Sequence, residues 1–255
     1  ADEGGSVISY MPPSAAVVTW NLQDVTFRNN TAGVGTINAL VSPTTSGTVV
    51  FQRVQWLQNT AQTSPALYLS ADQQLSNISM IDCLFHGNVA VQQAAAMVLA
   101  VPSGSPTVQF VDCSFANNTS PAIGSLYMSI QGTASPAIQL TGVQWQYESF
   151  TAPEPTTAAF TVFSTTSTSA TLSMHDCTLD HVNAHAVYVQ PLTTIELVNL
   201  TASHCSSTAV LLTSSDTSPS SITLTDLTFD HNALTDARDL LIEPSSFLTI
   251  ALSGT

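Results

Sequence analysis

One octet that recurs along the chain limits its fold more than any other feature of the sequence. The copy at residues 111–118, VDCSFANN, has the full pattern of an acidic residue, an aromatic residue and a final asparagine. Seven further copies begin at residues 23, 52, 81, 141, 175, 198 and 225, so the spacing runs from 23 to 34 residues. Repeats of this length are typical of solenoids, in which each unit packs only on its neighbours.

The hydrophobic pattern of each octet predicts two corners around a short strand. Val108 and Phe110 alternate with polar residues, but the next core-type residues are Cys113 and Phe115, after a step of three. Such a slip keeps side chains facing inward only if the backbone bends at the acidic position. Asparagine tolerates a left-handed corner conformation. We therefore expect that conformation at the last octet residue, in a ladder of Asn30, Asn59, Asn88, Asn118 and Asn232.

A third strand follows each variable loop, as in the runs that start at Ala66, Ala186 and Ala209. Three short strands per unit predict an all-β fold: a single parallel β-helix of about eight coils. We expect residues 1–17 to form an N-terminal arm or first partial coil and residues 18–255 the β-helix. Residues 151–171 are expected to be a Thr/Ser/Pro-rich insertion, and residues 245–255 an incomplete last coil.

The F-x-x-N motif at residues 27–30, 85–88, 115–118 and 229–232, with W-x-x-N at 56–59, carries a family resemblance. It resembles the right-handed parallel β-helices of the pectate-lyase-like superfamily, and in particular the repeats of chlamydial polymorphic outer-membrane proteins. The resemblance implies a right-handed coil with stacked corner asparagines. The companion G-G-A-[ILV] motif is degraded to x-A-[ILV], as at Ala66 and Ala122. Outer-membrane anchoring is not implied.

Equivalent positions of a solenoid lie about 4.8 Å apart, so the octet alignment predicts which side chains stack. One apolar column is expected to contain Phe27, Trp56, Phe85, Phe115, Trp145, Leu179 and Phe229. Cys83 and Cys113 share another position in adjacent coils, which permits either a disulfide or a pair of buried thiols.

Three histidines, His181, His204 and His231, align at one corner of consecutive coils, with Asp180 and Asp230 beside two of them. Imidazoles and carboxylates are ligands of divalent transition metals, so these histidines are weak candidates for a metal site. A row of solvated corner residues is the simpler interpretation. We predict no cofactor.

The charge of the chain excludes two classes of partner. Only three cations, Arg28, Arg53 and Arg238, stand against 17 acidic residues, for a formal net charge of −14. Binding to nucleic acid or to an anionic membrane surface needs clustered Lys and Arg, so we expect neither partner. The sequence also lacks an apolar run long enough for a membrane-spanning helix, and we expect no direct membrane insertion.

Catalysis is possible on this fold but is not what the residues favour. A polysaccharide lyase would need its basic residues at one place, and Arg28 and Arg53 occupy different octet positions. A hydrolase would need converging carboxylates. Asp82 and Asp112 share a position, with Asp24 nearby, but aspartate recurs there along the whole chain, which indicates a corner role. We therefore predict no catalytic residues and no enzyme, and keep a polysaccharide-binding or polysaccharide-degrading β-helix as the alternative.

Ice binding is less favoured, because a regular T-x-T grid is missing in the first five coils.

Five N-x-[ST] sequons, at Asn29, Asn77, Asn117, Asn118 and Asn199, indicate a secreted glycoprotein. A chain that starts at Ala1 fits a secreted protein whose signal peptide has been removed.

Neither end shows an amphipathic helix that would cap an open coil, and uncapped coils expose unpaired strands. We expect a structural or adhesive extracellular β-helix whose copies polymerise head-to-tail into a surface filament by strand addition.

Overall fold

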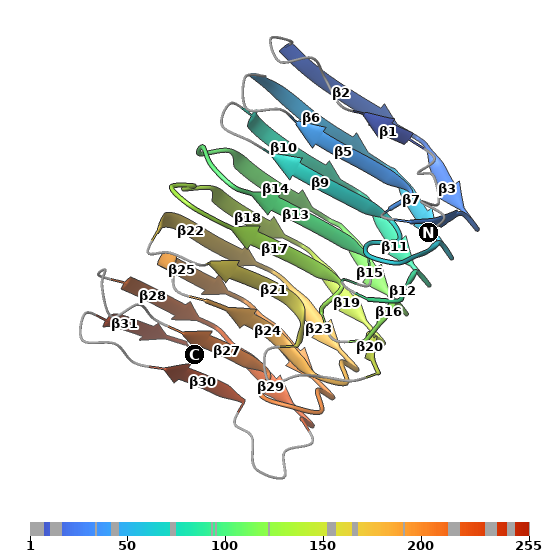
Figure 1. Cartoon of the computed structure of the whole chain (residues 1–255). Coiled ribbons are helices and arrows are strands. Elements are labelled where there is room, and N and C mark those ends of the chain that lie inside the picture. Colours follow the sequence, from blue (N-terminus) through green and yellow to red (C-terminus); the bar gives the residue numbers. More distant parts are fainter. Residues whose placement is uncertain are drawn as a thin grey trace.

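The computed structural model describes most of the chain. Described are residues 8–10, 17–33, 35–41, 46–71, 75–92, 94, 96–121, 123–151, 157–164, 168–190, 192–213, 220–232, 239–243 and 248–254. These residues contain strands and no helix, and no described segment forms a helix able to span a bilayer. They form a right-handed parallel β-helix, as predicted, and its count of about seven turns is close to the eight coils expected (Figure 1).

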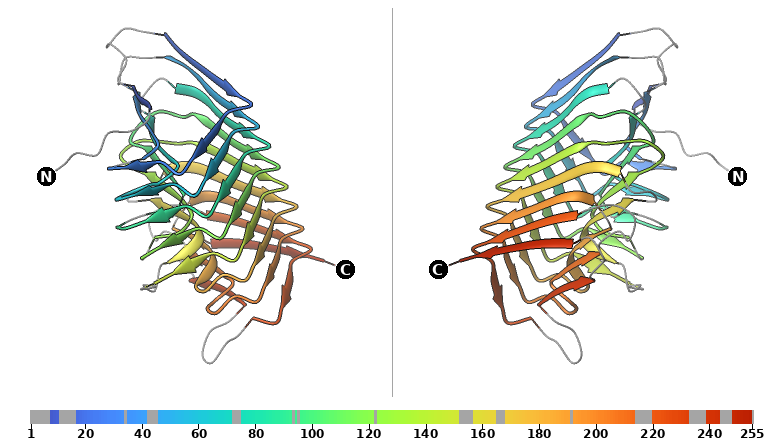
Figure 2. Two further views of the ribbon diagram at one scale, coloured as in Figure 1. Left: turned by 90° about the vertical axis from the view of Figure 1, so that its right-hand side faces the viewer. Right: turned by 90° about the vertical axis from the view of Figure 1, so that its left-hand side faces the viewer.

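Two sheets of nine strands each make up two long walls of the solenoid (Figure 2). Sheet A contains β1 (Ile8–Tyr10), β5 (Ile37–Val41), β9 (Leu67–Ala71), β13 (Met97–Val101), β17 (Leu126–Ile130), β21 (Ala158–Ser164), β24 (His185–Val189), β27 (Val210–Thr213) and β30 (Leu240–Glu243). Sheet B contains β2 (Val17–Gln23), β6 (Ser46–Gln52), β10 (Leu75–Ile81), β14 (Thr107–Val111), β18 (Ala137–Thr141), β22 (Thr168–His175), β25 (Leu192–Val198), β28 (Ser220–Thr225) and β31 (Leu248–Ser253).

The octets form the third wall. Sheet C has eight strands, one per octet: β3 (Thr26–Arg28), β7 (Gln55–Leu57), β11 (Leu84–His86), β15 (Ser114–Ala116), β19 (Gln144–Gln146), β23 (Thr178–Asp180), β26 (Thr201–Ser203) and β29 (Thr228–Asp230). Neighbouring strands pair in parallel and in the predicted register, with Phe85 opposite Trp56 and Phe115.

Among the described residues, a fourth, short sheet follows the first five octets, in addition to the three strands per coil that were predicted. It contains β4 (Thr31–Ala32), β8 (Thr60–Ala61), β12 (Val89–Ala90), β16 (Thr119–Ser120) and β20 (Ser149–Phe150). Two-residue strands carry no periodicity that a sequence pattern could reveal.

The predicted insertion at residues 151–171 is wrong in part. Residues 158–164 form β21, a regular strand of sheet A with Phe160 and Val162 fully buried, between two segments outside the described residues. At the N-terminal end, β1 of the predicted arm pairs with β5 and so belongs to the solenoid. At the other end, β31 of the predicted last coil pairs with β28.

Each octet makes its two corners with single residues in the left-handed region. The first corner is the acidic position, at φ between 51° and 66° in every coil: Asp24, Arg53, Asp82, Asp112, Gly142, Asp176, Asn199 and Asp226. Because Asp and Asn adopt this conformation more readily than other residues with a side chain, the recurring aspartate has the predicted corner role. The second corner lies one residue earlier than predicted, at Asn29, Gln58, Gly87, Asn117, Tyr147, His181, His204 and His231.

The asparagine predicted at that corner points into the core instead. Asn59, Asn88 and Asn118 are fully buried. Each donates both its backbone N–H and its side-chain amide to the equivalent residue one coil further on. The acceptor is the Oδ1 of Asn88 for Asn59, the Oδ1 of Asn118 for Asn88, and the Oε1 of Glu148 for Asn118. Asn30 begins this ladder by donating to Asn59. Asn232 lies apart and accepts from the Cys205 N–H. The predicted ladder is therefore present at four consecutive coils, inside rather than at the bend.

The rest of the interior is apolar, and the predicted aromatic column runs through it. Ring centroids from Phe27 through Trp56, Phe85 and Phe115 to Trp145 lie 4.6–5.9 Å apart with planes within 18°. Cys83 and Cys113 occupy one column as neighbouring buried free thiols, the second of the two predicted arrangements. The hydrogen bond with Cys83 and burial raise the pKa of the Cys113 thiol well above its ordinary value.

Candidate functional site

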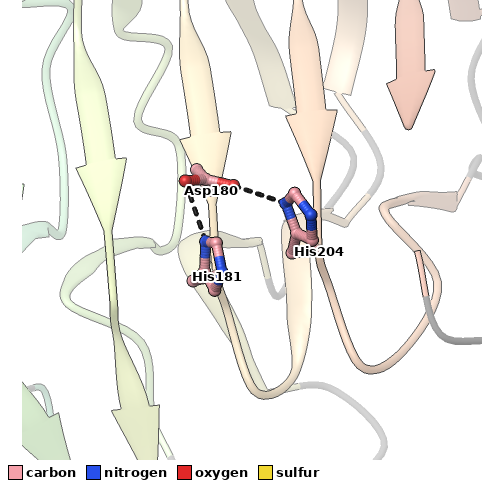
Figure 3. A group of neighbouring side chains, drawn as sticks. All are labelled: Asp180, His181 and His204. Atoms are coloured by element: carbon pink, nitrogen blue, oxygen red, sulfur yellow. Dashed lines mark hydrogen bonds and ion pairs between the residues drawn. The ribbon is translucent and has the colours of Figure 1, made fainter. Parts of the chain in front are cut away.

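Asp180, His181 and His204 form a cluster of potential metal-ligating side chains where two neighbouring strands of sheet C end (Figure 3). Their potential ligand atoms all lie within 4.8 Å of one another. Asp180 is the last residue of β23, His181 forms the corner after it, and His204 forms the equivalent corner after β26. The pairing of Asp180 with Ser203 puts the two corners one strand spacing apart.

The Asp180 carboxylate lies between the two imidazoles. Its Oδ2 is 2.9 Å from His181 Nδ1, and its Oδ1 is 2.9 Å from His204 Nδ1. The Ser203 hydroxyl also donates to Oδ1 at 2.7 Å. Partial burial acts to raise the pKa of Asp180, but the hydrogen bonds from Ser203, His181 and His204 outweigh it and hold the pKa below the ordinary value. The carboxylate is thus fixed in its ionised form.

The imidazoles belong to a longer stack of corner side chains. Tyr147, His181, His204 and His231 follow one another with ring centroids 4.8, 4.4 and 5.6 Å apart. His231 Nδ1 contacts its own neighbour Asp230 and lies outside the cluster. The structure therefore brings together two of the three predicted histidines, with Asp180 as the third member.

The residues weighed for catalysis lie along the exposed first corner. Asp24 is held by Arg53, whose guanidinium donates to both carboxylate oxygens at 2.6 and 2.9 Å. This hydrogen-bonded contact lowers the pKa of Asp24. Asp82 and Asp112 occupy the same corner in the next coils and are exposed. Arg28 is exposed at the end of β3, and Arg238 lies outside the described residues.

One ionisable residue was missed by the sequence patterns. Glu148 takes the place of the ladder asparagine in the fifth octet and is 1% exposed. Its Oε1 accepts from the backbone N–H and side-chain amide of Asn118, while no described residue donates to or accepts from Oε2. The next coil has Val182 at this position, which cannot form a hydrogen bond through its side chain. Burial raises the pKa of Glu148 to about 8, against the effect of the Asn118 hydrogen bonds.

With this geometry described, the chain can be compared with known proteins. Comparisons with protein-family models, curated proteins and solved structures found no match.

The two ends of the solenoid form a second candidate site. Among the described residues, nine hydrophobic residues pack only partly buried against the core, and all lie in the coils at either end of the solenoid: Ile8, Trp20, Leu22, Val25, Leu227, Phe229, Leu240, Ile242 and Leu248. Ile250 and Leu252 of β31 are 44% and 72% exposed. A pocket of about 490 Å³ opens beside them, with Phe229 and Leu240 in its lining. The described part of the last coil therefore leaves apolar side chains of the interior columns exposed.

The sequons lie in unlike environments. Asn29, Asn117 and Asn199 are exposed corner residues, and Asn77 is half-buried in β10. Asn118 is fully buried, and its side-chain amide donates to Glu148 and to the Phe85 carbonyl. The prediction of Asn118 as a glycan acceptor is therefore wrong, because a modified amide would not fit this interior. Asn117 is the accessible member of that pair.

Proposed function

We propose that this chain is a non-catalytic, extracellular structural protein whose copies stack head-to-tail into a filament. The observation that carries the proposal is that the interior columns are apolar where they end at both ends of the solenoid. Strand edges without a partner favour addition of further strands. A contact of this heterologous kind does not close on itself, so it propagates into a filament.

The register of the sheets supports one particular junction. Ile250 and Leu252 stand in the two interior columns of sheet B that begin with Trp20 and Leu22. Leu240 stands in the column of sheet A that begins with Ile8. A second copy that continues both sheets therefore places apolar side chains on apolar side chains in each column, and removes them from water.

Among the described strands of sheets A, B and C, the pocket lies at a strand position that such a junction leaves open. Sheet C has eight strands against nine in sheets A and B, so a position below β29 stays free when a copy is added. The pocket lies there, with Leu227, Phe229 and Leu252 in its lining. In chain order this position directly precedes β1 of the added copy. We propose that strand addition from the added copy completes it.

An extracellular location is supported by the sequons. Exposed Asn29, Asn117 and Asn199 can carry glycans without disturbing the core. Glycans would hydrate a surface that has few charges, because only 8% of the residues are charged. Kinship with the chlamydial polymorphic outer-membrane proteins belongs to the same proposal. It is supported by the F-x-x-N motif, since the Phe and Asn of each copy line the interior, as at Phe85 and Asn88.

We expect glycans at Asn29, Asn117 and Asn199, and none at Asn118, when the chain is secreted from a eukaryotic host. The measurement is mass spectrometry of peptides after enzymatic deglycosylation in heavy-oxygen water, which labels each former glycan site. Occupancy of Asn118, or bare asparagine at all three exposed sites, would contradict this part of the proposal.

Self-association is tested by placing a charge on the exposed end of the last coil. Leu252→Glu is expected to leave the fold intact, because the side chain is 72% exposed, and to abolish association, because the glutamate would face Leu22 of the next copy. Val91→Glu is the matched control, since Val91 is also exposed, at 53%, but lies on the side of the solenoid. Sedimentation velocity over a range of concentrations measures the assembly.

The wild-type chain and Val91→Glu should sediment as polymers, and Leu252→Glu as a monomer with an unchanged thermal midpoint. A wild-type chain that stays monomeric at all concentrations, or equal association of the two variants, would refute the junction.

A further inference from the structure

We propose that Asp180, His181 and His204 bind one divalent transition-metal ion of the Zn²⁺ type, which clamps two neighbouring coils together. Imidazole nitrogens with a carboxylate oxygen are the donor set that such ions prefer over Ca²⁺ or Mg²⁺. The site is independent of the proposed head-to-tail junction.

The ligand atoms are already close to the spacing that an ion requires. Donor atoms around a tetrahedral Zn²⁺ lie about 3.3 Å apart, given metal–ligand distances of about 2.0–2.1 Å. Each Nδ1 lies 2.9 Å from an Asp180 oxygen, so a small separation of the three side chains would admit an ion. Three protein ligands leave the remaining coordination positions to water.

Binding requires one ring to turn. The two imidazoles are nearly parallel, with planes 17° apart and centroids 4.4 Å apart, so their Nδ1 lone pairs do not meet at one point. Both side chains are close to half exposed, at 44% and 45%, which leaves room for rotation about the bond to the ring. In the bound form each neutral ring carries its proton on Nε2 and coordinates through Nδ1.

The surroundings hold the carboxylate ready for the ion. The Ser203 hydroxyl donates to Asp180 Oδ1 at 2.7 Å, a supporting contact of the kind that orients ligating carboxylates. Because Asp180 and His181 belong to one coil and His204 to the next, the ion adds a third link to two coils that already meet here through backbone pairing and through the hydrogen bonds of Asp180. An ion that binds only the folded chain raises its stability.

The test is titration calorimetry with Zn²⁺ alone, on tag-free protein stripped with a chelator and held in a non-coordinating buffer. We expect one saturable site in the wild-type chain. Asp180→Asn and His204→Ala should each weaken binding about 10-fold or more. His231→Ala is the matched control, because His231 lies in the same stack and contacts Asp230 instead; it should retain wild-type affinity within about two-fold.

A second readout separates loss of the site from loss of the fold. The thermal midpoint of the wild-type chain and of His231→Ala should rise with Zn²⁺ concentration, whereas that of His204→Ala should equal the wild-type value without metal and stay constant. A wild-type chain without saturable binding, or a His231→Ala variant weakened as much as His204→Ala, would overturn the proposal.

Discussion

Replacement of Glu148 by glutamine is expected to make the chain more stable at pH 8 to 9 and to remove a strong pH dependence of its unfolding. Burial in the folded chain raises the pKa of Glu148 to about 8 from an ordinary value of 4.5. The folded state therefore binds this proton more tightly than the unfolded state. Its stabilising effect is complete below pH 4.5 and is lost as the pH rises through about 8. With one pKa unit worth about 1.4 kcal/mol, the total loss is at most about 5 kcal/mol.

Urea unfolding followed at pH values from 4.5 to 9.5 measures this effect. The free energy of unfolding of the wild-type chain should fall across this range relative to that of Glu148→Gln, whose side chain is neutral throughout and still offers Oε1 to Asn118. Glu196→Gln serves as the control, because the Glu196 side chain is 45% exposed. Parallel pH curves for the wild-type chain and Glu148→Gln would show that burial of Glu148 has no energetic consequence.

Replacement of Asn88 by alanine is expected to destabilise the chain by about 3–5 kcal/mol, because it leaves several buried polar groups without a hydrogen-bond partner. The Asn88 side chain donates to the Trp56 carbonyl and to Asn118 Oδ1, and accepts from the backbone and side chain of Asn59. The Asn59 N–H, the Asn59 amide and the Trp56 carbonyl lose these partners in a site that water does not reach.

Asn30→Ala is the matched control for the ladder. Asn30 starts the ladder, is only partly buried, and contributes its side-chain amide to a single neighbour, Asn59. Its replacement should cost about 1 kcal/mol. Urea unfolding at pH 6 compares the two variants. Equal free energies of unfolding for Asn88→Ala and Asn30→Ala would contradict the view that the buried ladder holds the coils together.

The stacking of the coils could be predicted from the sequence because interior residues repeat in type. Phe85, Phe115 and Trp145 align in the octets and stack in the structure. Which of two adjacent polar residues turns the chain could not be predicted. Asn117 and Asn118 are chemically identical, and only the hydrogen bonds of the folded core decide that Asn118 points inward.

The candidate metal cluster could be predicted only in part. The alignment of His181, His204 and His231 by corner position was correct, but an alignment does not show where each side chain points. In the structure the Asp180 carboxylate lies between two of these rings, while His231 contacts Asp230. Glu148 escaped notice because the fifth octet ends in Tyr147-Glu148 and departs from the motif. In the core, its Oε1 accepts a hydrogen bond from the side-chain amide of Asn118, the asparagine before it in the ladder.

Helical reconstruction of the assembled protein by electron cryomicroscopy tests the head-to-tail stacking most directly. Nine strand layers in sheets A and B predict a rise of about 43 Å per copy, at about 4.8 Å per layer, with β31 of one copy parallel to β2 of the next. A subunit rise of that size in an unbranched filament is the expected result. Isolated single copies, or pairs joined through identical ends, would contradict it.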